Sequence, residues 1–149
     1  MIQIRTATKE DLPQLMRLMH QYIVDFYKSP EPTQEALQGL VTHLLENPYE
    51  GVQFVAESEN LQLAGFATLY FTFNTLEVKR MAVLYDLFVS SDFRRQNVGE
   101  SLFQTCLDHV REHDYSHMFW ETDHDNIPAQ TLYDKMGATR ARWLNYEIK

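Results

Sequence analysis

The stretch Asp86-Leu-Phe-Val-Ser-Ser-Asp-Phe-Arg-Arg-Gln-Asn-Val-Gly-Glu-Ser-Leu-Phe103 decides the fold, because it joins a strand to a helix through a short polar turn. Residues 81–89 form an apolar run that is typical of a strand. After the turn, apolar residues recur at helical spacing: Val98, Leu102, Phe103, Cys106, Leu107 and Val110. A helix N-terminus presents unpaired backbone N–H groups and the positive end of the helix dipole. The turn at residues 94–99 is therefore expected to bind an anion.

Two arginines strengthen this expectation. Arg94 and Arg95 precede the helix, where a cation gains nothing from the helix dipole. A phosphate-bearing ligand held at the same N-terminus would explain them, although exposed arginines are also common in loops. The turn is not a Walker motif, because no Gly-Lys-Ser/Thr follows, and it is not the dinucleotide pattern GxGxxG.

The turn resembles the pyrophosphate-binding signature of the GNAT acyl-CoA N-acetyltransferases, Arg/Gln-x-x-Gly-x-Gly/Ala. Arg94 and Gly99 match it, and Asn97 replaces the first glycine, which is a mild departure because asparagine tolerates positive φ. A later stretch, Asn126-Ile-Pro-Ala-Gln-Thr-Leu-Tyr-Asp-Lys-Met-Gly-Ala138, resembles the family's second signature, Asn-x-x-Ala-x-x-Leu/Phe-Tyr-x-x-x-Gly-Phe/Ala. The two motifs have the family's order and separation, and the resemblance extends over essentially the whole chain.

The resemblance implies a set of residues that bind acetyl-CoA. Backbone groups of one strand would pair with the pantetheine amides, and the turn would cradle the diphosphate; these residues are Leu87, Phe88, Val89, Arg94, Arg95, Gln96, Asn97, Val98, Gly99 and Glu100. Asn126 would bond pantetheine, and Tyr133 would be the general acid that protonates the departing thiolate. Read as residues alone, the strand could be an ordinary central strand, Asn126 a helix N-cap and Tyr133 a packing residue. Glu100 also suits the first turn of a helix without any ligand.

The group that takes the proton from the acceptor amine is less clearly marked. Asp86 begins the cofactor strand, and an acid at this position recurs in the polyamine branches of the family. It could accept a proton through water, bind a cationic acceptor, or cap a neighbouring loop. Glu121 and His124 are rivals for the role of base. Further candidates to face the acceptor cleft are Tyr22, Asp25 and Tyr27.

The order of elements predicts a layered α/β (α+β) fold in one domain, residues 1–149. We expect a strand at residues 2–4, a helix from residue 12 to 26, a helix after Thr33, strands at 52–57, 65–73 and 81–89, the helix after the turn, a strand at 116–122, a helix containing Tyr133, and a final strand at 142–148. Helix boundaries follow from Pro13 in a first turn, Thr33 as an N-cap and Gly137 as a C-terminal cap. The resemblance implies a mixed, mostly antiparallel sheet of about six to seven strands flanked by helices.

Composition bounds the partners. The 149 residues are 44% hydrophobic and 23% charged, with a net charge of −8, which disfavours nucleic acid and is compatible with a cationic acceptor. No apolar run predicts a membrane span, and the N-terminus lacks a signal-peptide pattern. One cysteine, Cys106, falls on an apolar helix face and demands no oxidising compartment, so a cytoplasmic location is expected. His109, His113 and His117 are spaced by four, but no further ligand completes a metal site, and no metal is expected.

The resulting hypothesis is an acetyl-CoA-dependent N-acetyltransferase that acts on a small primary amine by direct attack on the thioester. Residues 65–73 and 85–89 resemble the spermidine/spermine branch of the family, and residues 119–126 resemble the histone/polyamine branch. Acetylation of protein lysines and a non-catalytic acyl-CoA-binding module are the alternatives. Because the C-terminal region takes part in subunit pairing in the histone/polyamine branch, a homodimer is expected.

Overall fold

The computed structural model describes residues 1–149 and contains one mixed sheet whose strands are ordered as in the sequence, β1-β2-β3-β4-β5. The strands are β1 (Gln3–Thr6), β2 (Gly51–Glu57), β3 (Leu63–Asn74), β4 (Lys79–Val89) and β5 (Met118–Phe119). The first four pair antiparallel, and β5 runs parallel to β4. The predicted layered α/β class is therefore confirmed.

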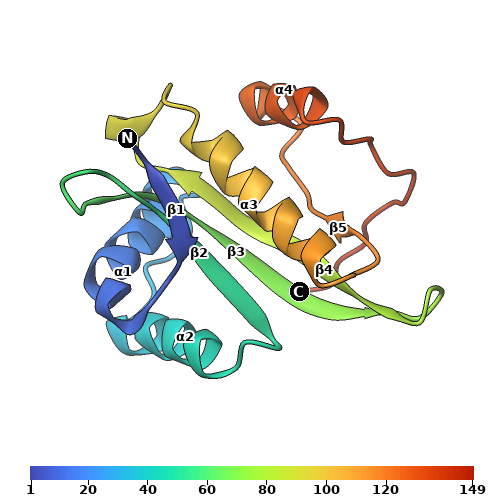
Figure 1. The fold of residues 1–149 in the computed structure, drawn as a ribbon, viewed down its shortest axis with the longest axis horizontal. Coiled ribbons are helices and arrows are strands. Elements are labelled where there is room, and N and C mark those ends of the chain that lie inside the picture. Colours follow the sequence, from blue (N-terminus) through green and yellow to red (C-terminus); the bar gives the residue numbers. More distant parts are fainter.

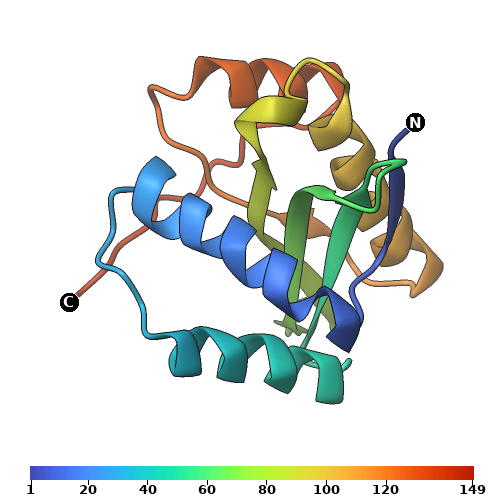
Figure 2. The same cartoon turned by 90° about the vertical axis from the view of Figure 1, so that its left-hand side faces the viewer.

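Helices cover both faces of the sheet (Figures 1 and 2). On one face lie α1 (Leu12–His20) and α2 (Gln34–Glu46). The short 3-10 turn η1 (Lys9–Asp11) precedes α1, and the π-helical turn η2 (Gln21–Phe26) continues it. On the other face lies α3 (Val98–Glu112), which follows the 3-10 turn η3 (Ser91–Phe93), with α4 (Ile127–Lys135) beside it. Each face buries its own cluster of apolar side chains, so the sheet separates two cores.

Short-range signals place the helix boundaries as the sequence predicts. The Thr33 side chain accepts a hydrogen bond from the Ala36 N–H at 3.1 Å, and Pro13 lies in the first turn of α1. Gly137 has a φ of 85° just beyond α4. The following Ala138 N–H bonds back to the Tyr133 carbonyl at 3.0 Å, which closes the helix end as expected of a C-terminal glycine cap.

Three predicted elements differ from the structure. The strand expected at 116–122 is reduced to Met118–Phe119, and the strand expected at 142–148 is irregular and exposed, so the sheet has five strands instead of six to seven. Figure 1 shows the chain after α4 returning past β5 without joining the sheet. A strand pattern needs a hydrogen-bonding partner, and β5 is too short to offer one. The first helix is also regular only to His20, because η2 replaces its last turns.

A β-bulge in β4 reverses which side chains face each helix layer. Thr68 lies opposite Asp86 and Leu69 lies opposite Leu84, so Tyr85 is the additional residue. Before the bulge, Leu84 packs in the core under α3; after it, Phe88 packs in the core under α1 and α2. Because side chains alternate between the faces of a strand, one extra residue turns Asp86 toward η2 instead of α3.

None of the helices has the length and apolar character needed to span a lipid bilayer.

Candidate active site

A cavity of about 480 Å³ lies along the last part of β4. Its wall comes from four places: η2 and the residue after it, β4, the turn that leads into α3, and the segment from Trp120 through α4. The parallel pairing of β4 with β5 is limited to Ala82 with Met118 and Val83 with Phe119. Beyond Val83, β4 therefore has no strand partner on this side, and the chain leaves β5 toward α4 (Figure 1).

The open side of β4 carries the residues predicted to pair with pantetheine. Leu87, Phe88 and Val89 all line the cavity. A strand edge without a neighbour exposes a row of backbone N–H and C=O groups, which an extended ligand can use as an added strand would. The amide groups of an extended, amide-containing ligand fit such an edge.

The predicted anion-binding turn forms one end of the cavity. Asn97 is the N-cap of α3 with φ 61° and ψ 22°, which confirms that asparagine takes the left-handed conformation here. Arg95 also has a positive φ, 67°, a conformation that costs a non-glycine residue of the order of 1–2 kcal/mol. Left-handed residues are typical of the backbone nests that bind anions, and strain of this kind concentrates at functional sites.

The first turn of α3 has no side-chain cap. The Asn97 side chain makes no capping hydrogen bond, which leaves the first N–H groups of the helix for a ligand. Arg94, Arg95, Asn97, Val98, Gly99 and Glu100 line the cavity, whereas the predicted Gln96 does not. Two arginines and an uncapped helix N-terminus make this end suited to phosphate.

Neither packing nor backbone conformation requires a glycine at position 99. A Cβ at this position would meet Val89 Cγ2 at 3.7 Å and Leu132 Cδ2 at 3.9 Å, which are ordinary contacts. Its backbone also lacks the positive φ that would require glycine. A ligand that approaches the backbone closely explains the glycine better than packing does.

Helix α4 places Asn126 and Tyr133 on the cavity wall. Asn126 caps the helix, since its Oδ1 accepts a hydrogen bond from the Ala129 N–H at 3.3 Å. The Tyr133 ring packs near Phe103 and Trp120, with centroid distances of 5.8 and 5.1 Å. Burial, and then the neighbouring Tyr27, raise the pKa of Tyr133, so its phenol keeps its proton at neutral pH. A packed ring with a protonated hydroxyl can donate a proton to a leaving group.

Asp86 is a buried acid without a cation. The residue is 8% exposed, and no lysine, arginine or histidine forms an ion pair with its side chain. Burial raises the pKa of Asp86, and the Thr68 and Tyr22 hydroxyls beside it oppose that shift. Asp86 itself does not line the cavity, whereas the adjacent Tyr85 and the facing Tyr22 do.

The end of the cavity nearest Asp86 has aromatic walls. Tyr22 and Phe26 lie in η2, Tyr27 follows it directly, and Tyr85 precedes Asp86 on β4. Of the polar candidates for this end, Glu121 lines the cavity, while Asp25 and His124 do not. Aromatic faces above a buried carboxylate are suited to an ammonium group, which both the ring quadrupole and the negative charge attract.

Several lining residues were not predicted from the sequence. The sequence pattern places Phe26 on the apolar face of the first helix and assigns no role to Trp120 or Lys135. Lys135 Nζ donates to Glu100 Oε2 at 2.8 Å, which brings a third cation to the phosphate end. The one available signal was its position in the last turn of the second motif's helix.

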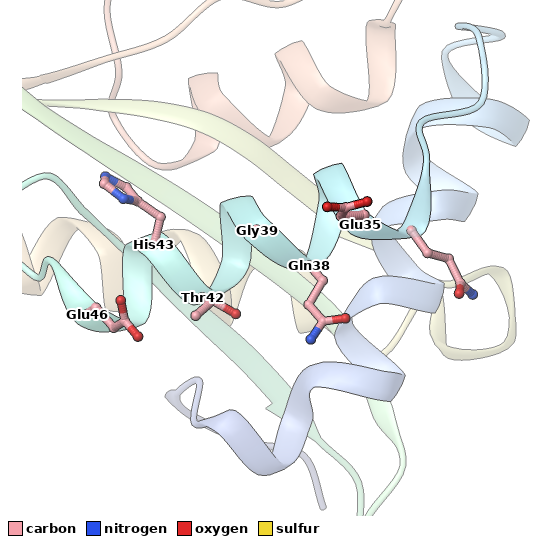
Figure 3. Close-up of a pocket in the computed structure, with 7 residues that line it drawn as sticks. Glu35, Gln38, Gly39, Thr42, His43 and Glu46 are labelled. Carbon is pink, nitrogen blue, oxygen red and sulfur yellow. The ribbon is translucent and has the colours of Figure 1, made fainter.

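A larger but shallower hollow, about 720 Å³, lies on the outer surface of α2 (Figure 3). None of its seven lining residues is hydrophobic, and all of them come from one helix. Figure 3 shows their side chains spread along the helix without converging. Binding sites combine apolar walls with a few converging polar groups, so the β4 cavity is the candidate site. No group of three or more His, Cys, Asp and Glu side chains is arranged to hold a metal ion.

A sheet that opens along one strand beside an uncapped helix N-terminus fits a transferase that binds an acyl-CoA. The model of the acetyltransferase (GNAT) family matches residues 15–138. YhfO, an uncharacterized N-acetyltransferase of Bacillus subtilis (strain 168), is 33% identical over 134 residues, which are 90% of this chain and 87% of the relative. The chain belongs to the GNAT family and is an N-acetyltransferase.

Solved structures agree with this assignment. A crystal structure of a probable acetyltransferase matches with a TM-score of 0.89 and 30% identity, over 99% of this chain and 97% of that one. A ribosomal-protein-alanine N-acetyltransferase from Brucella melitensis biovar Abortus 2308 shares the fold, with a TM-score of 0.79 at 19% identity, over 100% and 99% of the two chains. The GNAT fold implies acetyl-CoA as co-substrate, and the open β4 edge and the α3 turn fit such a ligand.

Proposed function

We propose that this enzyme transfers the acetyl group of acetyl-CoA directly to a small cationic primary amine, such as a polyamine. The observation that carries the acceptor class is Asp86, a buried acid that has no cation of its own and lies beside an aromatic cavity wall. An acceptor ammonium supplies the missing positive charge. The net charge of −8 favours the approach of a cation over that of an anion.

In this proposal, different cavity residues bind different parts of the co-substrate. Backbone groups of Leu87, Phe88 and Val89 pair with the pantetheine amides, and Asn126 adds a hydrogen bond beyond the one it makes as a cap. The diphosphate lies on the first turn of α3, with Arg94, Arg95, Asn97, Val98, Gly99 and Glu100 around it. Gln96 points to solvent in this arrangement and contributes least, since it is exposed and lies off the cavity wall.

Tyr133 is the general acid of the transfer in this proposal. The acceptor nitrogen attacks the thioester carbonyl carbon, the C–S bond breaks, and the Tyr133 hydroxyl gives its proton to the sulfur. A phenol has an ordinary pKa of ~10 and gives its proton to a developing thiolate more readily than water does. Its presence argues against a non-catalytic acyl-CoA-binding module.

A panel of amines tests the acceptor class. Release of the thiol from acetyl-CoA is followed with a diamine, a polyamine, a neutral amine, an acidic amino compound and a lysine peptide. The expected result is the highest kcat/KM for the polycations, and a fall of that value with added salt as attraction is screened. Faster turnover of neutral or anionic amines contradicts the cationic-acceptor proposal.

Acetylation of protein amino groups is the second candidate. It is favoured by the shared fold with a ribosomal-protein-alanine N-acetyltransferase. A lysine peptide and a peptide with an N-terminal alanine belong in the same panel. If a peptide exceeds every small amine in kcat/KM, the protein acceptor replaces the polyamine.

A further inference from the structure

Tyr22 occupies a fixed place between the core and the acceptor end of the cavity. It lies in η2, and its ring packs edge-on against Phe66 and Phe88, each at a centroid distance of 5.6 Å. Turns of π-helix are rare and are frequently found at functional sites. Here the turn holds the ring against the core while Tyr22 still lines the cavity.

The Tyr22 hydroxyl is surrounded mainly by acceptors. It donates to the Tyr85 carbonyl oxygen at 3.4 Å, which is a long bond, and it lies beside the Asp86 carboxylate. Its remaining polar neighbour is the Tyr27 hydroxyl. No lysine, arginine, histidine or backbone N–H donates to the phenol oxygen, so its lone pairs can accept a hydrogen bond from a ligand amine. A hydroxyl rotates about its C–O bond, so its single proton can turn from the Tyr85 carbonyl to the neighbouring Asp86 carboxylate.

Two buried polar residues, Gln53 and Thr68, lie in a row that leads to Asp86. The Gln53 side-chain N–H donates to Thr68 Oγ1 at 3.1 Å. Thr68 is fully buried, so its own hydroxyl proton needs a buried acceptor, and the Asp86 carboxylate lies beside it. The result is a row of groups, Gln53 to Thr68 to Asp86, and Tyr22 is the neighbour of Asp86 that also lines the cavity. Asp86 is thereby connected to the cavity through the Tyr22 hydroxyl.

We propose that Tyr22 is a further catalytic residue, whose hydroxyl contacts the acceptor ammonium and relays its proton to Asp86. The proposal rests on the amine acetylation proposed above. One ammonium proton passes to the Tyr22 oxygen while the phenol proton passes to Asp86, so the phenol is restored. The neutral amine forms the new C–N bond, the C–S bond breaks, and a second nitrogen proton balances the one that Tyr133 gives to the sulfur. The proton on Asp86 then returns to water.

The titratable groups that face Asp86 are consistent with this relay. They are Tyr22 from η2 and Tyr70 from β3. Burial and then the Asp86 charge raise the pKa of Tyr70 to about 12, and the same two causes raise the pKa of Tyr22. Both phenols therefore stay protonated, and Asp86 is the group that changes charge. Its own raised pKa brings it nearer to the working pH, which suits a proton acceptor.

A double-mutant cycle tests the connection. The variants are Tyr22→Phe, Asp86→Asn and the double change, with Tyr49→Phe as control because that ring is 78% exposed. At saturating acetyl-CoA, each single change is expected to lower kcat/KM for the acceptor by about 10- to 100-fold and to flatten its dependence on pH. The double variant is expected to be no slower than the slower single one, while the Kd of acetyl-CoA changes little. Losses that multiply in the double variant, or wild-type kcat/KM in Tyr22→Phe, overturn the relay.

A measurement without turnover separates this proposal from the proposed function. The titration of the Asp86 carboxyl carbon is followed by NMR in the protein without ligands. Removal of the Tyr22 hydroxyl is expected to raise the pKa of Asp86 further, because a donor to its charged form is lost. Tyr49→Phe is expected to leave that titration unchanged. If Tyr22→Phe also leaves it unchanged, the contact is absent and the relay is wrong, whether or not an amine is acetylated.

Discussion

Tyr133 combines a packed ring with a hydroxyl that has no partner in the chain. Tyr133→Phe keeps the contacts with Phe103 and Trp120 and removes only the acidic proton. We expect kcat to fall by ~10²-fold or more, with little change in the affinity for acetyl-CoA. Single-turnover kinetics, which isolate the chemical step, are the measurement. Near-wild-type turnover would make Tyr133 a packing residue.

The buried carboxylate of Asp86 is expected to lower the free energy of unfolding at neutral pH. Its pKa in the folded protein is raised above the unfolded value of ~3.9, so between these two values the folded state binds more protons than the unfolded state. Stability attributable to Asp86 therefore falls as pH rises through that window. We expect Asp86→Asn to have a higher Tm than the wild type at pH ~7, where 1 kcal/mol corresponds to about 2–4 °C. The difference is expected to shrink in acid, below the unfolded pKa.

The pKa of Asp11 is shifted in the opposite direction to that of Asp86. Arg5 donates to both its carboxylate oxygens at 2.8 Å, and this interaction lowers the pKa of Asp11. Its contribution is present above the unfolded pKa and is lost as pH falls through the folded value. Asp11→Asn is expected to lower stability at neutral pH by about 1–3 kcal/mol. Thermal unfolding of both variants against pH checks the two signs, and a lower Tm for Asp86→Asn at pH ~7 contradicts the first.

At the scale of elements, the first turn of α3 has the features of an anion-binding site, an uncapped N-terminus and a glycine that packing does not require. Gly99→Val introduces a side chain whose first atom meets only ordinary contacts in the protein, at 3.7 and 3.9 Å. We expect the variant to fold and to bind coenzyme A at least ~10-fold more weakly, because the branched side chain occupies the approach to the diphosphate. Calorimetry measures the affinity, and thermal unfolding checks the fold.

Gly39→Val is the matched control for that change. Gly39 lies on α2, and a Cβ there meets nothing within 4 Å. The cost of valine in a helix is shared by both variants, but only Gly99 borders the cavity. Unchanged affinity in folded Gly99→Val would show that the diphosphate lies elsewhere.

At the scale of the molecule, the last residues form an apolar segment that the single chain leaves uncovered. Trp143, Leu144, Tyr146 and Ile148 are between 72% and 100% exposed. Leu144, Tyr146 and Ile148 alternate with polar residues, the pattern of a strand with one apolar face. Exposed apolar clusters mark interaction sites, so we propose that a second copy of the chain covers this segment.

Light scattering checks the proposed homodimer. At micromolar concentration we expect twice the chain mass of 17.6 kDa for the full protein, and the single mass after removal of residues 142–149. Activity and unfolding of the shortened chain show whether it remains folded. A full-length protein that is monomeric with and without acetyl-CoA rules the dimer out.

The backbone geometry of the two motifs could be predicted from the sequence. The left-handed Asn97, the capping Asn126 and the left-handed Gly137 follow from preferences of a few neighbouring residues, and the structure has all three. The acceptor end could not be predicted in the same way. Which of Asp25, Tyr27, Glu121 and His124 reach the cavity depends on how η2 and the segment after β5 come together, and only Tyr27 and Glu121 do.

The sequence by itself determined the position of most helices, the caps of α2 and α4, the strands β2 to β4 and the left-handed turn before α3, because these depend on local φ/ψ preferences and on the spacing of apolar residues. The tertiary structure decided what depends on a partner. The pattern at 142–148 forms no strand where no neighbour offers hydrogen bonds. The bulge at Tyr85, which becomes apparent only when β4 is paired with β3, turns Asp86 away from α3 and toward Tyr22. A strand's apolar pattern reports burial but not register, and register set the orientation of the acid in the site.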